Sequence, residues 1–488
     1  MLDAYWLAGI AYSLCLIALG CWGIHRFVLL LWLRQKPDVA TPTKTATPTV
    51  LVQLPVYNEP KVISRIIDAV AQLDWPSMEI QVLDDSTDET CAIAASRVAH
   101  WSEQGVMISH IRRDHRTGYK AGALAHGLDL SPAKYIAIFD ADFVPEPDFL
   151  RKMMPSLLEP NVGMVQACWG HLNRNQNWTT RVQAMILDGH FVIEHTARFR
   201  SGRFFNFNGT AGIWRRDCII DAGGWSHDTV TEDLDLSYRA QMKGWNFIYR
   251  DDVVAPAELP GTTRAFLGQQ HRWAKGTVQT SRKLLDPILL SNFPVRVRLE
   301  AANHLLMVWA YPTVFLLSIL FPLSILARVQ MDGASLLILD LFAVIATTVS
   351  IGFFYAVALQ RSGERLRSRW WEIPLAMSVG IGCSGSQTLA VIEGAWSNDA
   401  TFERTPKQGT SNPQTVVPPA HRARLLISSS MSAYYAMAMY WTISASHWES
   451  LPFMLLFATG YWLITFTQWT EGSRTAEAAE MGVAHAAK

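Results

Sequence analysis

The feature that most constrains this chain of 488 residues is a set of long apolar stretches on either side of a charged central region. A helix needs about 20 apolar residues to cross the hydrocarbon core of a bilayer. Charged residues are dense between positions 55 and 300 and sparse within the apolar stretches. The sequence therefore predicts a soluble domain inserted in a bundle of transmembrane helices, with spans at Trp6–Leu33, Leu305–Ala327, Ala334–Leu359, Leu425–Ala445 and Leu451–Trp469.

The loops between the apolar stretches predict the orientation of the chain. Arg361–Arg369 carries four arginines, whereas Val329–Gly333 and Ser446–Ser450 carry no lysine or arginine. Loops rich in lysine and arginine stay in the cytoplasm. We therefore expect a multi-pass integral membrane protein whose soluble domain and C-terminal tail face the cytoplasm, with the bacterial inner membrane as the expected location.

A sixth apolar stretch, Pro374–Ile392, contains several serines and glycines together with Gln387. If this stretch crossed the bilayer, the basic residues Arg404 and Lys407 that follow it would lie outside the cell, against the charge rule. We predict that Pro374–Ile392 lies in the membrane interface or re-enters the membrane without crossing it.

Composition excludes several classes of protein. The formal net charge is zero, which gives no electrostatic case for binding nucleic acid. None of the six cysteines forms a CxxC pair, and this spacing suggests neither a zinc site nor a disulfide framework. Unpaired buried thiols are the simpler interpretation.

The central region alternates short apolar runs with helical ones. Val50–Leu54, Ile80–Leu83 and Tyr135–Phe139 read as strands, and the last two are followed directly by aspartates. Segments with helical spacing separate them. This alternation predicts an α/β domain with a parallel sheet and a ligand crevice along the carboxyl ends of its strands.

Two aspartates follow the strand that ends at Phe139. Residues two apart in an extended segment share a face, so Asp140 and Asp142 project into the same space. Mg²⁺ or Mn²⁺ takes one or two carboxylates together with phosphate oxygens. The pair could hold such a cation, and a solvated acidic turn is the alternative.

Two further acidic segments stand where a strand ends or a helix begins. Asp84 and Asp85 could accept hydrogen bonds from a base or a ribose, and capping of the following helix is the alternative. Thr231–Asp235 opens a helix, where Asp233 could take a proton from an attacking hydroxyl. The helix N-terminus is expected to favour the ionised form of that carboxylate, and capping is again the alternative.

A third group of residues suits a phosphate leaving group and a sugar. Arg272 could stabilise charge on a departing pyrophosphate, and Trp273 offers an apolar face to a pyranose ring. A surface helix with one buried tryptophan would explain the same residues. Gly118–Gly122 opens a helix with Lys120, an arrangement that suits phosphate but is weak alone.

Read in order, these segments resemble the family 2 glycosyltransferases of the cellulose-synthase type. The matching segments are Leu54–Glu59, Leu83–Asp88, Gly118–Leu124, Phe139–Phe143, Thr231–Asp233 and Gln269–Trp273. The stretches Phe207–Arg215 and Gln269–Gly276 are most similar to the cellulose-synthase-like mannan and glucan synthases. The resemblance implies a nucleotide-sugar-binding domain of the GT-A type within a transmembrane bundle.

The resemblance also implies a role for each matching residue. The expected catalytic residues are Asp233 and Glu232, and Asp233 is the expected general base. Asp140 and Asp142 are expected to hold the metal. Trp273, Gly209 and Thr210 are the expected acceptor-binding residues. The expected donor-binding residues are Tyr57, Glu59, Asp84, Asp85, Lys120, Asp140, Gln269, Arg272, Phe402, Thr405 and Lys407.

The last three donor-binding residues belong to Phe402–Lys407, which is similar to the gating loop of cellulose synthase with Arg404 in place of valine. The expected organisation is a transmembrane helix at 1–36, the cytoplasmic GT-A domain at 45–285, interfacial helices at 286–304, a transmembrane pair at 305–359, the interfacial or re-entrant segment with the gating loop at 372–424, a second transmembrane pair at 425–470 and a cytoplasmic tail at 471–488.

The resemblance implies an inverting hexosyltransferase that uses Mg²⁺ or Mn²⁺. The leading hypothesis is synthesis and export of a β-1,4-linked polysaccharide from UDP-glucose or GDP-mannose. Transfer of a single sugar to a membrane lipid is the alternative, because relatives that glycosylate lipids share the same motifs. A catalytically inactive scaffold or transporter is disfavoured by the intact set of acidic and QxxRW residues. The expected partners are therefore the donor, a glycan or lipid acceptor and the bilayer, without nucleic acid.

Overall fold

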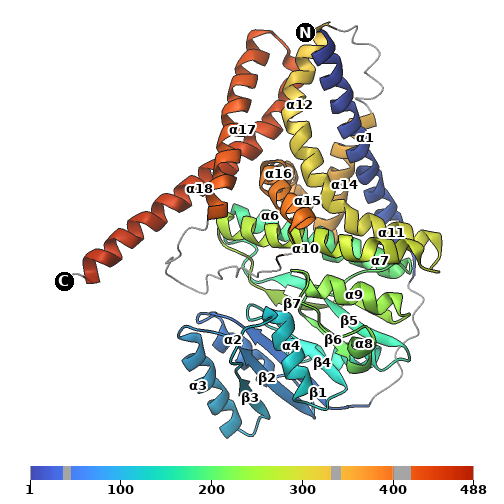
Figure 1. The fold of residues 1–488 in the computed structure, drawn as a ribbon, viewed down its shortest axis with the longest axis vertical. Coiled ribbons are helices and arrows are strands. Elements are labelled where there is room, and N and C mark those ends of the chain that lie inside the picture. Colours follow the sequence, from blue (N-terminus) through green and yellow to red (C-terminus); the bar gives the residue numbers. More distant parts are fainter. Residues whose placement is uncertain (1, 37–45, 331–341, 398, 400–418, 487–488) are drawn as a thin grey trace.

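The computed structural model describes residues 2–36, 46–330, 342–397, 399 and 419–486. Figure 1 shows an α/β domain at one end of the molecule and a group of long helices at the other. Helices α6 (Trp178–Asp188), α10 (Thr263–Leu290) and α11 (Val295–Leu306) lie between the two parts. This arrangement agrees with a soluble domain carried by a membrane bundle.

A mixed sheet of seven strands forms the centre of the α/β domain, in the order β3-β2-β1-β4-β6-β5-β7. Strands β1 to β4 are parallel, as the sequence predicted. Strand β6 runs antiparallel to β4 and β5, which the sequence did not predict. The strands are β1 Val50–Val56, β2 Met78–Asp84, β3 Ile108–Ile111, β4 Tyr135–Ile138, β5 Val162–His171, β6 Gly212–Arg215 and β7 Asn246–Ala257.

Helices cover both faces of this sheet, because its strands are apolar on both sides. Val50, Val52 and Leu54 of β1 face one buried cluster, while Leu51 faces the other. Burying one such side chain stabilises the fold by about 1.5–3 kcal/mol. The covering helices are α2 Ile63–Ala71, α3 Thr90–Glu103, α4 Tyr119–Asp129, α5 Phe149–Leu157, α7 Thr196–Arg200, α8 Arg216–Asp221 and α9 Glu232–Met242.

Five helices in the described part of the chain are long and apolar enough to cross a membrane: Leu7–Trp32, Val295–Ile325, Val344–Arg361, Glu372–Trp396 and Trp448–Ser473. Four of these coincide with predicted spans. The predicted span Leu425–Ala445 is a continuous helix, α17 (Pro419–Ser444), but it is absent from the five. The remaining long elements are α1 Leu2–Trp32, α12 Ala310–Gln330, η4 Val344–Val349, α14 Ser350–Arg361, α16 Glu372–Trp396 and α18 Leu451–Ala486.

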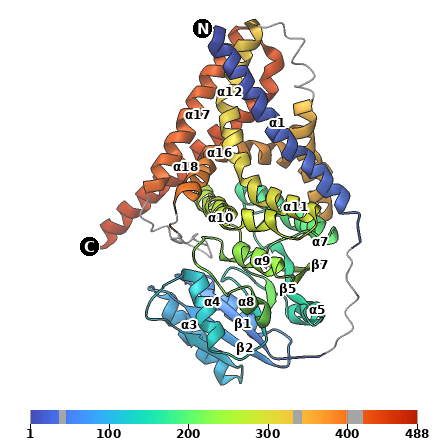
Figure 2. The same ribbon diagram turned by 45° about the vertical axis from the view of Figure 1, so that its right-hand side comes forward.

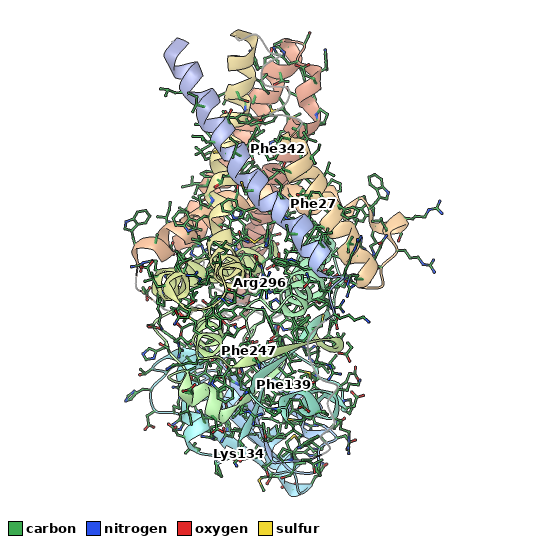
Figure 3. All side chains as sticks on the ribbon, turned by 90° about the vertical axis from the view of Figure 1, so that its right-hand side faces the viewer. Phe27, Lys134, Phe139, Phe247, Arg296 and Phe342 are labelled. Carbon is green, nitrogen blue, oxygen red and sulfur yellow. The ribbon has the colours of Figure 1, made fainter. Side chains whose placement is uncertain are left out.

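The surface of the long helices supports a lipid-facing bundle. Figure 3 places Phe27 and Phe342 in the bundle, Arg296 at its junction with the α/β domain, and Phe139 and Phe247 within that domain. Large apolar side chains are exposed along the bundle, where a monomer in water would carry few. They include Leu7, Leu14, Leu31, Phe353, Leu455 and Phe466.

Helix α16 differs from the other apolar helices in its surroundings. Figures 1 and 2 both show it between α10 on one side and α12 and α17 on the other. Of its most apolar stretch 61% is buried, against 28–33% for the other four helices. Gly394 near its end lies against Lys275 and Val278 of α10. This packing favours the interfacial interpretation of 374–392, which stays a prediction.

Candidate active site

A cavity lies at the carboxyl ends of β1 and β4, facing the start of α9 and the middle of α10. It brings together most of the residues that the sequence predicted: Tyr57, Glu59, Asp85, Lys120, Asp140, Asp142, Gly209, Glu232, Asp233, Gln269, Arg272 and Trp273. Asp84 and Thr210 are described but do not line it. Phe402, Thr405 and Lys407 lie outside the described residues.

The predicted metal motif follows β4 directly. The backbone N–H of Asp140 donates to the hydroxyl oxygen of Thr210 at 2.9 Å. Thr210 is fully buried, so it holds the backbone of the motif. It does not face the cavity, although the sequence predicted it as an acceptor-binding residue. Asp142 is 8% exposed and lines the cavity together with Asp140.

The donor set of this motif fits a divalent cation. The described residues include no cluster of three or more His, Cys, Asp or Glu side chains able to hold a metal by themselves. Asp140 and Asp142 would supply two carboxylates, and phosphate oxygens and water would complete the shell. Mg²⁺ and Mn²⁺ bind phosphates in this way. The cation would neutralise charge on the diphosphate.

Lys120, an expected donor-binding residue, lies beside the metal motif. Its Nζ donates to Asp140 Oδ1 at 2.5 Å and to the carbonyl oxygen of Gly209 at 2.9 Å. Burial opposes its charge, but the carboxylates of Asp140, Glu232 and Asp233 outweigh burial and raise the pKa of Lys120. The ammonium group therefore stays charged and offsets part of the acidic cluster.

Gly209 has no side chain, and this leaves room for the charged groups of Asp233 and Lys120 beside it. Its φ is +80°, which an L side chain rarely adopts. A Cβ atom at this position would lie 3.0 Å from Asp233 Oδ2 and 3.2 Å from Lys120 Nζ. The backbone conformation therefore favours glycine here, and any side chain would have to displace Asp233 and Lys120 by a few tenths of an ångström.

The predicted catalytic carboxylates are the first two residues of α9. Thr231 precedes them, but its side chain makes no capping hydrogen bond. Burial, followed by the neighbouring Asp233 charge, raises the pKa of Glu232. Burial also raises the pKa of Asp233, although Lys120 opposes the shift. The backbone N–H groups at the start of α9 lower the pKa of Asp233, as expected, but burial is the stronger effect and the net shift is upward.

At the opposite end of the cavity, two arginines that the sequence reading missed accompany the predicted residues. Arg113 Nε donates to Asp85 Oδ1 at 3.0 Å. The guanidinium carbon of Arg116 lies 3.4 Å from the centre of the Tyr57 ring. Both arginines stand between β3 and α4, where three arginines precede Gly118 within six residues. That cluster of basic residues was the available signal.

Asp84 has a different role from the predicted contact with the nucleoside. Its side chain is fully buried, and its oxygens contact His110 Nε2 at 2.9 Å and the Ser86 N–H at 2.9 Å. Burial alone would raise the pKa of Asp84, but hydrogen bonds from His110, Ser86 and Cys91 lower it to about 2. Asp84 therefore fixes the loop that presents Asp85.

Helix α10 carries Gln269, Arg272 and Trp273 into the same cavity. Its first backbone N–H groups, of Thr263 and Arg264, donate to the carboxylate of Glu471 at 2.7 and 3.0 Å. A carboxylate at a helix N-terminus is favourable because it accepts from unpaired N–H groups. The last apolar helix of the bundle therefore anchors the helix that carries the QxxRW residues.

One glycine brings this helix close to the catalytic carboxylates. A Cβ atom on Gly276 would lie 2.5 Å from the Thr231 methyl group. The absence of a side chain at 276 lets α10 pack directly on the residue before Glu232. Trp273 consequently faces the same space as Asp233.

The mixed sheet, the paired aspartates after a central strand and the cavity beside them define a GT-A-type glycosyltransferase domain. Residues 48–276 match the family described as "Glycosyltransferase like family 2". This region of the chain is therefore similar to the family 2 glycosyltransferases, and the predicted resemblance is confirmed.

Curated relatives match the same part of the chain. Glucomannan 4-beta-mannosyltransferase 2 of Arabidopsis thaliana is 47% identical over 249 residues, which are 50% of this chain and 47% of the relative. Glucomannan 4-beta-mannosyltransferase 1 of Oryza sativa subsp. japonica is 44% identical over 263 residues, 52% of this chain and 49% of the relative. The chain spans about half the length of these relatives.

A solved structure extends the likeness of the fold to the long helices. The mannosyltransferase PcManGT from Pyrobaculum calidifontis, in complex with GDP-Man and Mn²⁺, aligns with a TM-score of 0.53 at 23% identity. The alignment covers 81% of this chain and 99% of that one. It therefore reaches well beyond the α/β domain. The predicted bacterial inner membrane gains no support from the curated relatives above, which are plant proteins.

Proposed function

We propose that this protein transfers mannosyl units from GDP-mannose to the non-reducing end of a β-1,4-linked mannan or glucomannan chain. The observation that carries the proposal is the convergence of Asp142, Asp233, Arg272 and Trp273 on one cavity. The names of the plant relatives and the GDP-Man complex of the archaeal structure favour mannose over glucose as the transferred sugar.

The chemistry follows from where these groups stand. A hydroxyl of the acceptor attacks the anomeric carbon of the donor, and Asp233 takes the hydroxyl proton. The bond from the anomeric carbon to the diphosphate breaks on the opposite face, which inverts the configuration. Arg272 and Gln269 line the cavity where the diphosphate would leave, so a guanidinium is available to stabilise its charge.

The raised pKa of Asp233 suits this role. A carboxylate with a pKa near the working pH both accepts a proton readily and releases it after turnover. Lys120 keeps the neighbouring charges balanced while the donor is absent. Trp273 would hold the terminal acceptor sugar against the base by stacking.

The proposed location follows from the source of the donor. Nucleotide-sugars are made in the cytoplasm, so we propose that the cavity faces the cytoplasm and the product leaves through the bundle. Transfer of one sugar to a membrane lipid remains the alternative outcome.

A product analysis tests the proposal. Purified protein in lipid nanodiscs would be incubated with labelled GDP-mannose or UDP-glucose, with Asp233→Asn as the inactive control. We expect label from GDP-mannose in a product that endo-β-1,4-mannanase degrades. Label that extracts into organic solvent and resists the enzyme would replace the polysaccharide proposal with the glycolipid one.

A further inference from the structure

A second cavity continues from the active site into the helical bundle. Its walls include residues of η1 (Gly189–His195), α1, α6, α10, α12, α14 and α16. A molecule whose reacting end lies at Asp233 therefore has room to continue between the helices. The residues common to both cavities are Trp169, Asn208, Thr231, Asp233 and Trp273.

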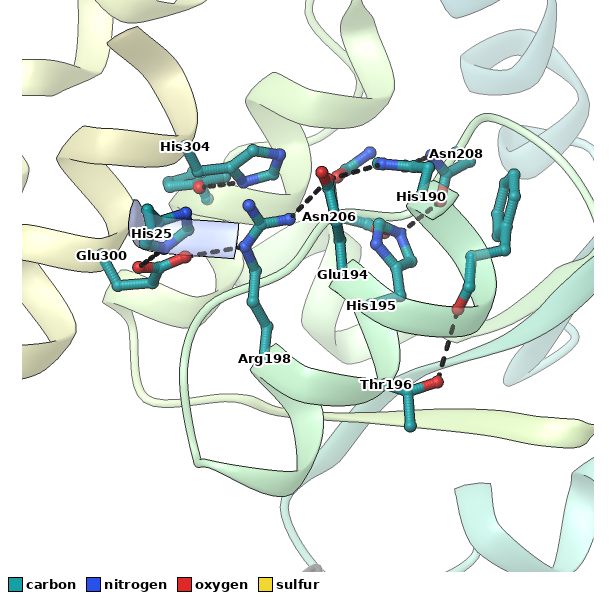
Figure 4. Close-up of polar contacts among 12 residues, drawn as sticks. His25, His190, Glu194, His195, Thr196, Arg198, Asn206, Asn208, Glu300 and His304 are labelled. Atoms are coloured by element: carbon teal, nitrogen blue, oxygen red, sulfur yellow. Dashed lines mark hydrogen bonds and ion pairs between the residues drawn. The ribbon is translucent and has the colours of Figure 1, made fainter. Parts of the chain in front are cut away.

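The wall nearest the active site is polar and held in place by hydrogen bonds, as Figure 4 shows. The amide nitrogen of Asn208 donates to His190 Nε2 at 3.0 Å. His190 therefore carries its proton on Nδ1 and donates it to Glu194 at 3.2 Å. All three residues line the second cavity. They offer fixed donors and acceptors to whatever occupies it.

This polar wall is anchored by buried charges. Arg198 is fully buried and donates to Glu194 at 3.4 Å and to Glu300 at 3.0 Å. Glu300 of α11 also contacts His25 Nε2 of α1 at 2.8 Å. Figure 4 shows the chain of contacts running from α1 to Asn208. The first helix of the bundle is therefore tied to the wall of the cavity.

The walls that come from α12, α14 and α16 are aromatic and apolar except at Gln387. Tyr311, Phe354 and Tyr355 line this part together with a face of α16. On that face Gln387 is fully buried, and neither its amide oxygen nor its amide nitrogen has a hydrogen-bond partner within the described residues. A buried polar group left unpaired costs about 1–3 kcal/mol. Such groups are rare in native proteins unless a ligand or water completes them.

We propose that Gln387 selects a sugar chain as the acceptor in the second cavity, by hydrogen-bonding a sugar that lies beyond the second one from the reacting end. The inference rests on the proposed function and selects its acceptor class. A sugar hydroxyl both donates and accepts, so neighbouring hydroxyls can satisfy both atoms of the amide. The aromatic residues beside it offer stacking faces. An acyl chain would leave the amide unpaired, which disfavours a lipid acceptor.

The test compares acceptors of different length in the wild type and in Gln387→Leu. Purified protein would receive GDP-mannose and soluble β-1,4-mannobiose or β-1,4-mannohexaose. We expect Gln387→Leu to raise KM for mannohexaose about tenfold, the value of one hydrogen bond of about 1.4 kcal/mol, and to leave KM for mannobiose and for GDP-mannose unchanged. We also expect its Tm to rise, because the substitution removes an unpaired buried amide.

Gln468→Leu is the matched control. Gln468 of α18 is also buried in the bundle, and its amide oxygen also has no partner within the described residues. Its amide nitrogen, unlike that of Gln387, donates to Ser428 Oγ and to the Ile464 carbonyl, both at 3.3 Å. It does not line the second cavity. We expect this variant to lower Tm and to leave every KM unchanged. A purely structural role for Gln387 would make the two variants alike.

Two results would overturn the inference in distinguishable ways. If the wild type makes β-mannan and Gln387→Leu shows the wild-type KM for both oligosaccharides, the proposed sugar contact is wrong while the proposed function stands. If the wild type elongates neither oligosaccharide and labels only a lipid, the proposed function and this inference fail together.

Discussion

The two cavities are built in different ways, although they meet at Asp233. Residues of the donor cavity stand in short groups at the ends of strands and at the starts of helices, such as Asp140 and Asp142 after β4. The second cavity takes its residues from helices far apart in the chain, and they include Arg26, Glu194 and Gln387. Short sequence motifs therefore predict the residues of the donor cavity, whereas few residues of the second cavity belong to a recognisable motif.

The two sides also treat charge differently. In the donor cavity the carboxylates of Glu232 and Asp233 are half-buried and adjacent in the chain, and their pKa values rise. Beside the second cavity the buried charges of Arg198 and Glu300 are paired. Unbalanced charge suits groups that gain or lose protons, and paired charge suits groups that hold helices together.

Removal of the metal should have the largest effect, and it acts on the donor side alone. With EDTA we expect transfer to fall to background, because Asp142 and the diphosphate would otherwise repel each other. Added Mn²⁺ or Mg²⁺ should restore turnover. The rate of transfer of labelled mannose is the measurement. Full activity of Asp142→Asn without metal would show that the donor cavity works by lysine and arginine alone.

Loss of the general base comes next. We expect Asp233→Asn to lower kcat by about 10²–10⁴-fold, because the acceptor hydroxyl loses its proton acceptor. Donor binding, measured by calorimetry with GDP, should change little. Unchanged turnover in folded protein would instead assign the role of general base to Glu232.

Breaking the buried ion pair tests the membrane side. In Glu300→Gln the buried guanidinium of Arg198 loses one of its two carboxylate partners. We expect the free energy of unfolding to fall by about 3 kcal/mol, seen as a lower midpoint of thermal inactivation. Asp74→Asn, which breaks an exposed pair with Arg151, should change that midpoint little. Equal effects would contradict a junction held by buried charge.

Substitution of Gly209, which lies beside Asp233, distinguishes the effect of backbone strain from the effect of a displaced catalytic group. We expect Gly209→Ala to reduce kcat about tenfold, because the new methyl group displaces Asp233 and Lys120 by tenths of an ångström. Gly202→Ala is the control, since its φ of +66° is also positive but no atom lies within 4 Å. Both variants should lose about 1 kcal/mol of stability. Equal loss of activity would assign the whole effect to backbone strain.

The smallest expected effect is on pH dependence. Burial raises the pKa of Asp233 to about 6, and the base acts only when ionised. Activity should therefore be present above that value and be lost as the pH falls through it, with about half remaining at pH 6. The profile of kcat/KM for the acceptor measures this limb. An acid limb near pH 4 would indicate that the bound metal and donor cancel the effect of burial.

Much of the donor side was predictable from residue order. The predicted strands Val50–Leu54, Ile80–Leu83 and Tyr135–Phe139 agree with β1, β2 and β4 within a few residues, because short apolar runs report directly on buried strands. The antiparallel strand β6 was not predicted, because the four residues Gly212–Arg215 contain no sequence signal that shows which way a strand runs in the sheet. The predicted role of Asp84 in binding the donor was wrong, because the sequence gives no sign that His110 would lie beside Asp84.

By itself, the sequence determined the class of fold, the apolar helices and most of the residues at the donor cavity, because each depends on neighbours within a few positions. Only the tertiary structure decided that Lys120 serves the aspartates, that burial overrides the helix N-terminus at Asp233, and that Gln387 borders a cavity continuous with the active site. Burial and long-range contacts govern these properties, and both arise only when distant segments of the chain pack together.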